Sequence, residues 1–342
     1  MENIHKKKLN KKIKIKISTE GLGTPFVKQL KSFNCTWDNC EFFINEEIAE
    51  CDFWVVYGGL WGKENVLVCK ENTLLITTEP PSVKKYQKKF LNQFGAIIGC
   101  DRSIKHPNIH HQQQSLPWWV GHKLKSTNED DVIIEKTYDE LKLINIEKKD
   151  KLISIIVSNK KFTKGHRERL EFVKKLQREF DNIIDIFGTG FNMIEDKWDA
   201  IAPYKYHIVI ENSSYKDYFT EKLSDAFLGQ SYPIYYGCPN IYDYFSQNAL
   251  SQIDINKPDE ATKIIKKIIQ SDQYENSVNH IKNAKDLILE KYQIFPMLNE
   301  YVNTYISDKE KKIVTLKPEK KSNMKKLIRK LIKITLKIFK KN

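Results

Sequence analysis

A polar run at the start of one predicted helix carries the chemistry that is easiest to interpret. Thr220 is placed to cap a helix over 220–228, with Glu221 and Lys222 in its first turn. The unpaired N–H groups and the dipole of a helix start favour a bound anion such as phosphate. A lysine in that turn opposes the dipole unless an anion lies nearby. We therefore interpret Lys222 as a phosphate ligand; the alternative is a pair of solvated charges beside a threonine cap.

Other ionisable and amide residues follow predicted strands. Glu211 and Asn212 come directly after the apolar run 208–210, and Glu79 follows the run 73–78. Glu79 precedes a proline, which holds it in an extended conformation. In open parallel sheets the ligand binds beyond the carboxyl ends of the strands, so all three side chains are candidates for a ligand site. For Glu79 the alternative is a strand-end acid that caps a turn.

The first half of the chain alternates short apolar runs with a helical pattern. The predicted strands are 13–18, 53–57, 73–78 and 96–98, and the predicted helix is 83–94. This alternation favours a mostly parallel sheet with helices on its faces. Residues 101–150 read as irregular, and we place a domain boundary near residue 148.

The second half repeats the same rhythm. It predicts strands at 152–157, 183–187, 206–210 and 233–236, a glycine turn at 188–190, and helices at 167–180, 220–228, 261–269 and 278–292. The predicted fold class is α/β, with two Rossmann-like domains at 1–148 and 149–310. Residues 311–342 are predicted to form a basic tail.

The net charge of +13 is concentrated at the two ends of the chain. Residues 1–16 hold seven lysines, and 317–342 hold eleven lysines or arginines, which leaves 39 basic and 42 acidic residues in the body. By composition the body is therefore not a nucleic-acid-binding surface. The six cysteines lack a CxxC pair or a histidine partner at metal spacing, so we expect reduced thiols and no metal site. The sequence has neither a signal-peptide pattern nor an apolar run long enough for a membrane span.

The segment 211–227 carries a specific pattern. It reads Glu-Asn-Ser-x-x-x-Asp-Tyr-x-Thr-Glu-Lys-Leu-x-x-Ala-Phe, and Pro-Ile-Tyr-Tyr-Gly-x-Pro-Asn follows it. This pattern resembles the donor-binding motif of glycosyltransferase family 10, the α-1,3/α-1,4-fucosyltransferases. The resemblance implies a GT-B fold in which two Rossmann-like domains face each other across a cleft. It also implies a C-terminal domain that binds GDP-fucose, an N-terminal acceptor domain, and inversion at the sugar carbon without a metal or other cofactor.

Roles for individual residues follow from this resemblance. Lys222 corresponds to the lysine that contacts the donor diphosphate, Glu221 to the glutamate that holds the ribose hydroxyls, and Tyr218 to a tyrosine beside the nucleotide. Glu211 and Asn212 would line the fucose and phosphate pocket.

The resemblance also implies an arginine clamp and a catalytic base. An arginine just before or inside the helix 167–180 would hold the pyrophosphate; spacing favours Arg167, with Arg169 in reserve. A planar guanidinium suits this task because it bonds two phosphate oxygens at once. Glu79 matches the family's segment that supplies the base for the acceptor hydroxyl, and only closure of the two domains could bring it to the donor.

The last residues form a basic amphipathic pattern. Apolar residues recur at three and four positions from Met324 to Phe339, with lysines and one arginine between them. Such a helix is too short and too charged to span a bilayer and suits an anionic leaflet. We therefore expect a cytoplasmic protein docked peripherally on the inner face of the cytoplasmic membrane. The alternatives are a solvated helix, a packed helix and a nucleic-acid contact.

These observations favour an inverting fucosyltransferase that acts on a glycan such as a lipopolysaccharide O-antigen. Contacts to a diphosphate and a ribose do not identify the sugar, so the same fold with another nucleotide sugar is one alternative. A non-catalytic nucleotide- or glycan-binding protein is another. For the favoured function, the expected partners are a nucleotide sugar, a glycan and an anionic membrane surface, and no nucleic acid.

Overall fold

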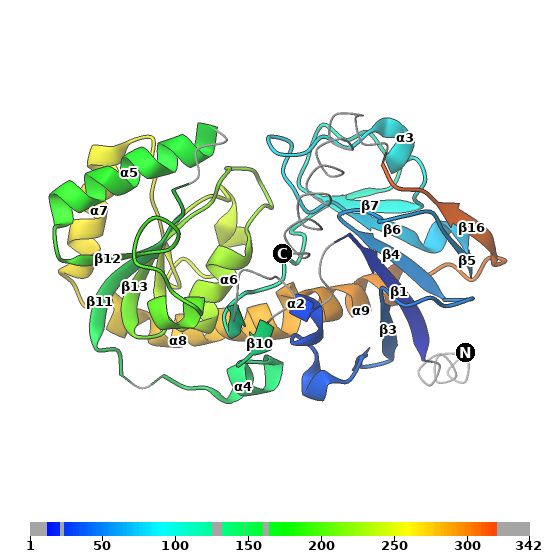
Figure 1. The fold of residues 1–342 in the computed structure, drawn as a ribbon, viewed down its shortest axis with the longest axis horizontal. Helices are drawn as coiled ribbons and strands as arrows, with labels where there is room; N and C mark the ends of the chain where they lie inside the picture. Colours follow the sequence, from blue (N-terminus) through cyan, green and yellow to red (C-terminus); the bar gives the residue numbers. More distant parts are fainter. Residues whose placement is uncertain (1–11, 21–23, 125–131, 147, 160–163, 320–342) are drawn as a thin grey trace, which may run out of the picture.

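Two α/β domains lie next to each other in the computed structural model (Figure 1). The structure describes residues 12–20, 24–124, 132–146, 148–159 and 164–319. Each domain is built around a sheet whose strands are mainly parallel, with helices packed against it. Two facing Rossmann-like domains are the GT-B architecture, and this part of the predicted fold class is confirmed. The predicted amphipathic helix lies outside the described residues.

The first domain contains a seven-stranded sheet in the order β2-β3-β1-β4-β6-β7-β8. Only the β2–β3 pair is antiparallel. All five residues of the central strand β4, Phe53–Tyr57, are buried, as expected for a parallel strand covered on both faces. The other strands are β1 (Ile13–Thr19), β2 (Thr36–Trp37), β3 (Cys40–Ile44), β6 (Thr73–Ile76), β7 (Ala96–Gly99) and β8 (Ile109–His111), and the helices are α2 (Thr24–Val27), α3 (Lys88–Leu91) and α4 (Tyr138–Leu143).

The second domain contains a five-stranded, wholly parallel sheet in the order β12-β11-β13-β14-β15. The strand β13, Tyr204–Ile210, lies at its centre, and its last five residues are buried. The remaining strands are β11 (Lys151–Ile156), β12 (Ile184–Phe187), β14 (Tyr232–Tyr236) and β15 (Ser251–Gln252), and the helices are α5 (Lys164–Phe180), α6 (Glu221–Leu228), α7 (Pro258–Ile269) and α8 (Gln273–Leu287).

After α8 the chain returns to the first domain. A π-helical turn, Ile288–Tyr292, leads into α9, Ile294–Tyr305, which Figure 1 shows beneath the first sheet. The ring of Phe295 packs edge-on against that of Phe42, with 4.8 Å between centroids. The strand β16, Lys312–Leu316, then pairs antiparallel with β5, Glu64–Val68.

The structure differs here from the predicted ranges, which assigned 149–310 to the second domain and 311–342 to a tail. Residues 294–316 contact the first domain because α9 carries an apolar face that the first sheet buries. Leu316 is also fully buried, in a cluster of apolar side chains of the first domain that includes Trp54 and Val68. The beginning of the second sheet at Lys151 agrees with the predicted boundary near residue 148.

The segment 83–94 contains less helix than its pattern predicts. Only Lys88–Leu91 form a helix, and Val83 is exposed. The earlier part of the segment turns toward the first sheet instead, because Lys84 donates to the carbonyl of Gly58 at 2.9 Å. The predicted irregular region 101–150 also contains β8, the β9–β10 pair (His122–Leu124 and Val132–Ile134) and α4.

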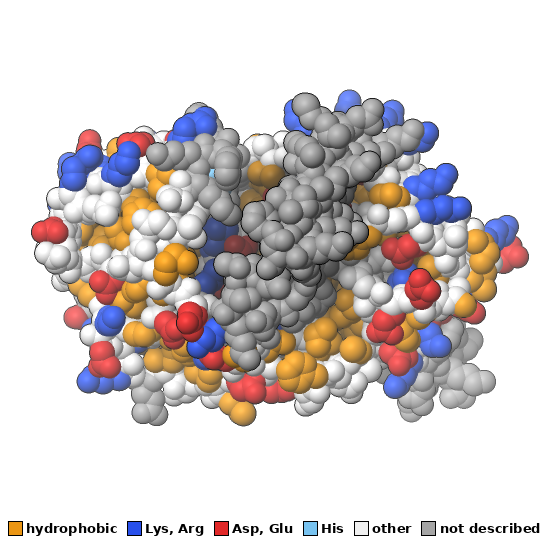
Figure 2. Space-filling view, in the orientation of Figure 1, with side chains coloured by type: hydrophobic (Ala, Val, Ile, Leu, Met, Phe, Trp, Pro, Cys, Tyr) orange, Lys and Arg blue, Asp and Glu red, His pale blue; other side chains and the backbone are white. Residues whose placement is uncertain are grey.

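Charged side chains of both signs are spread over both domains in the face shown in Figure 2. This distribution agrees with a body that is close to neutral by composition. Within the part of the chain that the structure describes, no helix is both long and apolar enough to cross a membrane.

Candidate functional site

The start of α6 rests on a buried carboxylate. Thr220 caps the helix, and its side chain accepts a hydrogen bond from the backbone N–H of Lys222 at 3.3 Å. Glu211, only 1% exposed, accepts from the backbone N–H of Thr220 at 2.8 Å and also contacts its hydroxyl. Burial raises the pKa of the Glu211 carboxyl, and the charge of Lys222 opposes that rise. Glu211 therefore supports the helix start from beneath, at the carboxyl end of β13.

Two carboxylates surround the ammonium group of Lys222. Its Nζ lies 3.0 Å from Oε1 of Glu221 and 3.4 Å from Oε2 of Glu211. Burial opposes ionisation of Glu221, but the charges of Lys222 and Lys197 outweigh it and lower the pKa of Glu221 to about 2. Lys222 is thus balanced by carboxylates of its own domain, which explains why a lysine is tolerated in the first helical turn.

The arginine that reaches this region is Arg169, not Arg167. Arg169 is 5% exposed, and its guanidinium donates to Oδ1 of Asn212 at 2.5 Å and to Oγ of Ser158 at 3.3 Å. The side chain of Arg167 is exposed. Residue 169 lies on the buried face of α5 and residue 167 does not, so the structure favours Arg169 over Arg167, which spacing favoured; the clamp role of either arginine stays a prediction.

The apolar pattern of α5 in the sequence could have identified Arg169 as the buried arginine. Phe172, Val173, Leu176 and Phe180 form the buried stripe of α5. Continuing that stripe one turn toward the amino terminus leads to residue 169, seven positions before Leu176.

Close approach of α5 to β13 depends on a glycine. A Cβ atom on Gly165 would lie 2.1 Å from the carbonyl oxygen of Asn212. The predicted glycine turn after β12 also forms, with Gly188 at a φ of +111°. The close approach at Gly165 and the turn at Gly188 bring the ends of β11, β12 and β13 around one pocket.

The pocket has a volume of about 380 Å³ and lies at the carboxyl ends of these strands, as predicted for the ligand site. Asn212, Glu221 and Lys222 line it, whereas Glu211 and Tyr218 are buried beneath. The other lining residues are Ile156, Val157, Ser158, His166, Arg169, Gly188, Thr189, Lys197, Ile201, His207, Ile208, Val209, Ile210 and Asp225.

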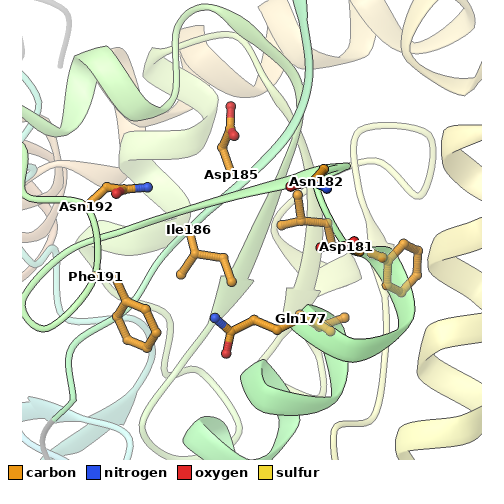
Figure 3. A pocket seen from close by; sticks show the side chains of 10 residues that line it. Gln177, Asp181, Asn182, Asp185, Ile186, Phe191 and Asn192 are labelled. Atoms are coloured by element: carbon orange, nitrogen blue, oxygen red, sulfur yellow. The ribbon is translucent and has the colours of Figure 1, made fainter.

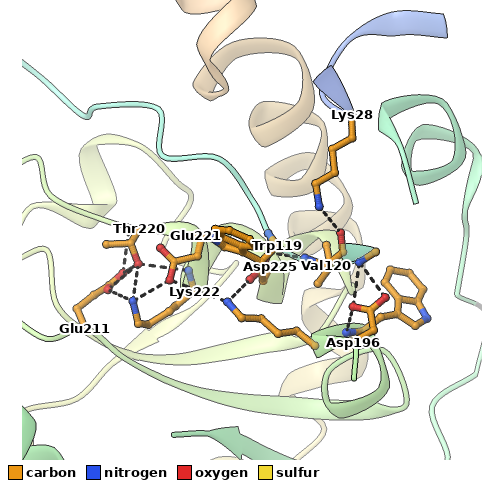
Figure 4. A network of polar contacts seen from close by, with 12 residues as sticks. Lys28, Trp119, Val120, Asp196, Glu211, Thr220, Glu221, Lys222 and Asp225 are labelled. Carbon is orange, nitrogen blue, oxygen red and sulfur yellow. Dashed lines mark hydrogen bonds and ion pairs between the residues drawn. The ribbon is translucent and has the colours of Figure 1, made fainter. Parts of the chain in front are cut away.

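Sequence reasoning missed Lys197 and Asp225. Nζ of Lys197 lies 2.8 Å from Oδ2 of Asp225 and 3.9 Å from Oε1 of Glu221. Asp225 also accepts from the backbone N–H groups of Trp119 and Val120, at 2.7 and 3.0 Å (Figure 4). Asp225 follows Glu221 by one helical turn, a spacing that could have identified it. Lys197 lies in a 3₁₀ turn with no periodic signal.

Glu79 comes from the first domain and lies close to these groups. Burial and the negative charge of Glu221 raise the pKa of its half-buried carboxyl, while the charges of Lys222 and Lys84 lower it. Tyr218 also lies among these carboxylates, and burial, together with the charges of Glu211 and Glu79, raises its pKa. The structure therefore brings Glu79 together with the predicted residues of the second domain.

Contacts between the domains hold this arrangement. The hydroxyls of Ser82 and Ser213 are 2.8 Å apart, and they belong to the loops that follow Glu79 and Asn212. Arg102 of the first domain forms an ion pair with Asp217 of the second. The two strand-end loops thus face each other directly.

A second hollow of about 380 Å³ lies at the outer edge of the second sheet (Figure 3). Asp181, Asp185 and the amides of Gln177, Asn182 and Asn192 line it, and no lysine, arginine or histidine does so among the described residues. It is a poor site for a nucleotide diphosphate, because it offers the anion no cation. None of the predicted site residues lies there.

The described residues contain no group of three or more histidine, cysteine, aspartate or glutamate side chains that could hold a metal ion. All six cysteines are free thiols, and five of them are buried.

A match to a known protein family covers the second domain. Residues 146–294 match the family model for the C-terminal domain of glycosyltransferase family 10 (fucosyltransferase). The human 4-galactosyl-N-acetylglucosaminide 3-alpha-L-fucosyltransferase 9 is 30% identical over 132 residues, which cover 37% of this chain and 35% of that protein. The Helicobacter pylori alpha-(1,3)-fucosyltransferase is 32% identical over 78 residues, 22% of this chain and 16% of that protein. The match thus spans about a third, or less, of the length of these relatives.

Among solved structures, an α1,3-fucosyltransferase with GDP superimposes with a TM-score of 0.48 at 17% identity. The superposition covers 82% of this chain and 92% of that one. Anabaena HepE in complex with UDP superimposes with a TM-score of 0.45 at 9% identity, over 85% of this chain and 100% of that one.

Proposed function

We propose that the chain is a member of glycosyltransferase family 10, whose C-terminal model matches residues 146–294, and that it transfers fucose from GDP-fucose to a hydroxyl of a glycan. One observation carries the proposal: the loop that follows Glu79 in the first domain meets the loop that follows Asn212 in the second, where the hydroxyls of Ser82 and Ser213 are 2.8 Å apart. Arg169 and Lys222, two cations suited to a diphosphate, line the pocket of the second domain.

In the proposed reaction the acceptor oxygen attacks the anomeric carbon of fucose from the side of the first domain. Glu79 takes the proton of the attacking hydroxyl, the new carbon–oxygen bond forms, and the bond from that carbon to the phosphate oxygen breaks. Arg169 and Lys222 balance the charge that develops on the departing GDP. Attack opposite the leaving group inverts the configuration at the sugar carbon.

A raised pKa suits Glu79 for this task. A general base works best when its pKa is near the working pH, and burial moves the Glu79 carboxyl in that direction. Glu221, by contrast, stays ionised, with a pKa of about 2, as a group that accepts hydrogen bonds from ribose hydroxyls must do.

Turnover with GDP-fucose tests the proposal. The protein is incubated with GDP-fucose and a panel of glycans, including lipopolysaccharide O-antigen fragments, and GDP release and the fucosylated product are measured. A panel of other nucleotide sugars is run in parallel. Turnover with another donor alone would identify a different sugar specificity on the same fold. Thermal stabilisation by GDP without turnover on any donor would identify a non-catalytic binding protein.

The chain's own cations make metal-independent transfer the natural expectation, and the reaction should proceed unchanged in EDTA. A strict requirement for a divalent ion would contradict this part of the proposal. The family resemblance implies no other cofactor.

We also propose a peripheral location on the inner face of the cytoplasmic membrane, on the strength of the amphipathic pattern from Met324 to Phe339, outside the described residues. Deleting 320–342 should abolish binding to vesicles of anionic lipid and leave hydrolysis of the donor intact. If the deletion abolished binding to RNA or DNA and left vesicle binding unchanged, the tail would be a nucleic-acid contact.

A further inference from the structure

Two polar side chains at one end of the nucleotide pocket have no role in the proposed reaction. Lys197 and His207 both line the pocket that contains Glu221 and Lys222. His207 lies within β13 and is 4% exposed, while Lys197 begins the 3₁₀ turn Lys197–Ala200. The apolar residues Ile201 and Val157 line the same pocket.

The hydrogen bonds of His207 fix its tautomer. Ser154 donates its hydroxyl hydrogen to the carbonyl oxygen of Ala200 at 2.5 Å. A hydroxyl has one hydrogen, so in the 2.8 Å contact between Ser154 and His207 the serine oxygen accepts and Nδ1 of the histidine donates. Burial, with the charges of Lys197 and Lys149, lowers the pKa of His207 to about 3, so the ring is neutral. Its Nε2 is therefore a hydrogen-bond acceptor.

No described residue hydrogen-bonds to that Nε2 atom. His207 lines the pocket, so this acceptor is available to a ligand that donates a hydrogen bond.

Lys197 supplies the complementary donor. Asp225 holds its Nζ at 2.8 Å and is itself fixed by the backbone N–H groups of the 119–120 segment. The nearest oxygen of Glu221, at 3.9 Å, is beyond hydrogen-bond distance. An ammonium group has three hydrogens, so Lys197 can still donate into the pocket.

The order of these groups along α6 matches the order of parts in a nucleoside diphosphate. Lys222 and Glu221 lie in the first turn, and Asp225, with Lys197, lies one turn further along the helix. Figure 4 shows the same sequence of contacts, from Glu211 and Lys222 through Glu221 to Asp225. With the diphosphate at Lys222 and the ribose at Glu221, the base is placed beside Asp225 and Lys197.

We propose that Lys197 and His207 recognise the nucleobase by an edge that carries a carbonyl oxygen next to a ring N–H. Lys197 donates to the carbonyl and His207 accepts from the N–H. Guanine presents this edge through O6 and N1–H, whereas adenine presents an amino group and a bare ring nitrogen, the reverse pattern. The inference rests on the proposed function, because it takes the base to be that of the donor GDP-fucose.

Calorimetric titration of the full chain with GDP, IDP and ADP tests this assignment. The wild type should bind GDP at least about tenfold more tightly than ADP, the range of discrimination of a good pair of base contacts. IDP keeps the carbonyl and ring N–H and lacks only the 2-amino group, so it should follow GDP. In Lys197→Met the affinities for GDP and IDP should fall and that for ADP should not, which brings the GDP-to-ADP ratio to within about threefold.

Lys205→Met is the matched control. Lys205 lies on the same strand as His207 and is paired with Glu275, but it does not line the pocket. Its variant should keep the wild-type ratio, and circular dichroism should show both variants folded. His207→Phe removes the acceptor and should likewise reduce the ratio.

Two results would overturn the inference while leaving the proposed function standing. An unchanged GDP-to-ADP ratio in Lys197→Met would show that the lysine does not contact the base. An equal loss for all three nucleotides would identify Lys197 as a third cation on the diphosphate. If the wild type binds no nucleotide at all, it is the proposed function that fails.

Discussion

Arg169 donates a 2.5 Å hydrogen bond to the side-chain oxygen of Asn212, which joins the first turns of α5 to the end of β13. The bond fixes a buried guanidinium that lines the pocket of the second domain. Its Nε is enclosed by the protein and has no hydrogen-bond partner among the described residues. An anionic ligand at this point would meet an arginine whose orientation is already set.

The two arginines of α5 form a matched pair for mutation. Arg169→Ala should weaken GDP binding roughly ten- to hundredfold, because hydrogen bonds to a charged group contribute about 1.5–3 kcal/mol. Arg167→Ala should change it less than about threefold, since that side chain is exposed and does not line the pocket. Titration calorimetry with GDP measures both. A larger loss in Arg167→Ala than in Arg169→Ala would restore the assignment that spacing first suggested.

Glu79→Gln should lower kcat by about 10²–10⁴-fold, the contribution of a positioned general base. The amide keeps the size of the side chain but cannot take the acceptor proton. In the proposed reaction the second domain holds GDP, so the affinity of Glu79→Gln for GDP should stay close to that of the wild type. Near-normal turnover in Glu79→Gln would require another residue as the base.

The same carboxyl predicts a pH dependence of the reaction. A general base must be ionised, so kcat/KM should fall as the pH drops through the pKa of Glu79. Burial and Glu221 raise that pKa above the ordinary value of 4.5, and the acidic limb of the profile should therefore lie above pH 4.5. Removing the negative neighbour in Glu221→Gln should shift the limb to lower pH. A limb that moves upward or stays in place would show that Glu79 is not the titrating group.

The sequence predicts the parts of this site that depend on periodicity. Apolar runs locate β6, β11 and β13, and Glu79 and Asn212 lie beyond the carboxyl ends of β6 and β13, where ligands of parallel sheets bind. Glu211 follows the same strand as Asn212, yet it is buried beneath the helix cap. Which of two adjacent side chains faces the pocket depends on how the strand end packs.

Other features depend on contacts between distant segments. Lys197 comes from a 3₁₀ turn without a repeating pattern, and only its ion pairs with Asp225 and Glu221 place it in the pocket. The return of α9 to the first domain depends on which sheet buries its apolar face, and an amphipathic pattern is the same for either choice.

Ionisation of Glu221 makes the free energy of unfolding depend on pH. Its pKa in the folded protein is about 2, below the ordinary value of 4.5, so the ionised form is favoured by folding. The contribution is complete above pH 4.5 and is lost as the pH falls toward 2. Urea unfolding from pH 6 to 3 should show a steeper loss of stability in the wild type than in Glu221→Gln. Equal slopes would mean that the ion pair with Lys222 does not contribute to folding in solution.

Asp225 should be the most sensitive single position in the contact between α6 and the 119–120 segment. It is fully buried and accepts from two backbone N–H groups as well as from Lys197. Asp225→Ala leaves these donors without an acceptor and should cost about 2–5 kcal/mol of unfolding free energy. Asp225→Asn keeps one oxygen for the backbone groups and should cost less, but its amide cannot neutralise Lys197. Urea denaturation measures the unfolding free energies, which should decrease from the wild type to Asp225→Asn to Asp225→Ala. An alanine variant as stable as the wild type would show that water replaces these contacts and that Asp225 does not hold the two segments together.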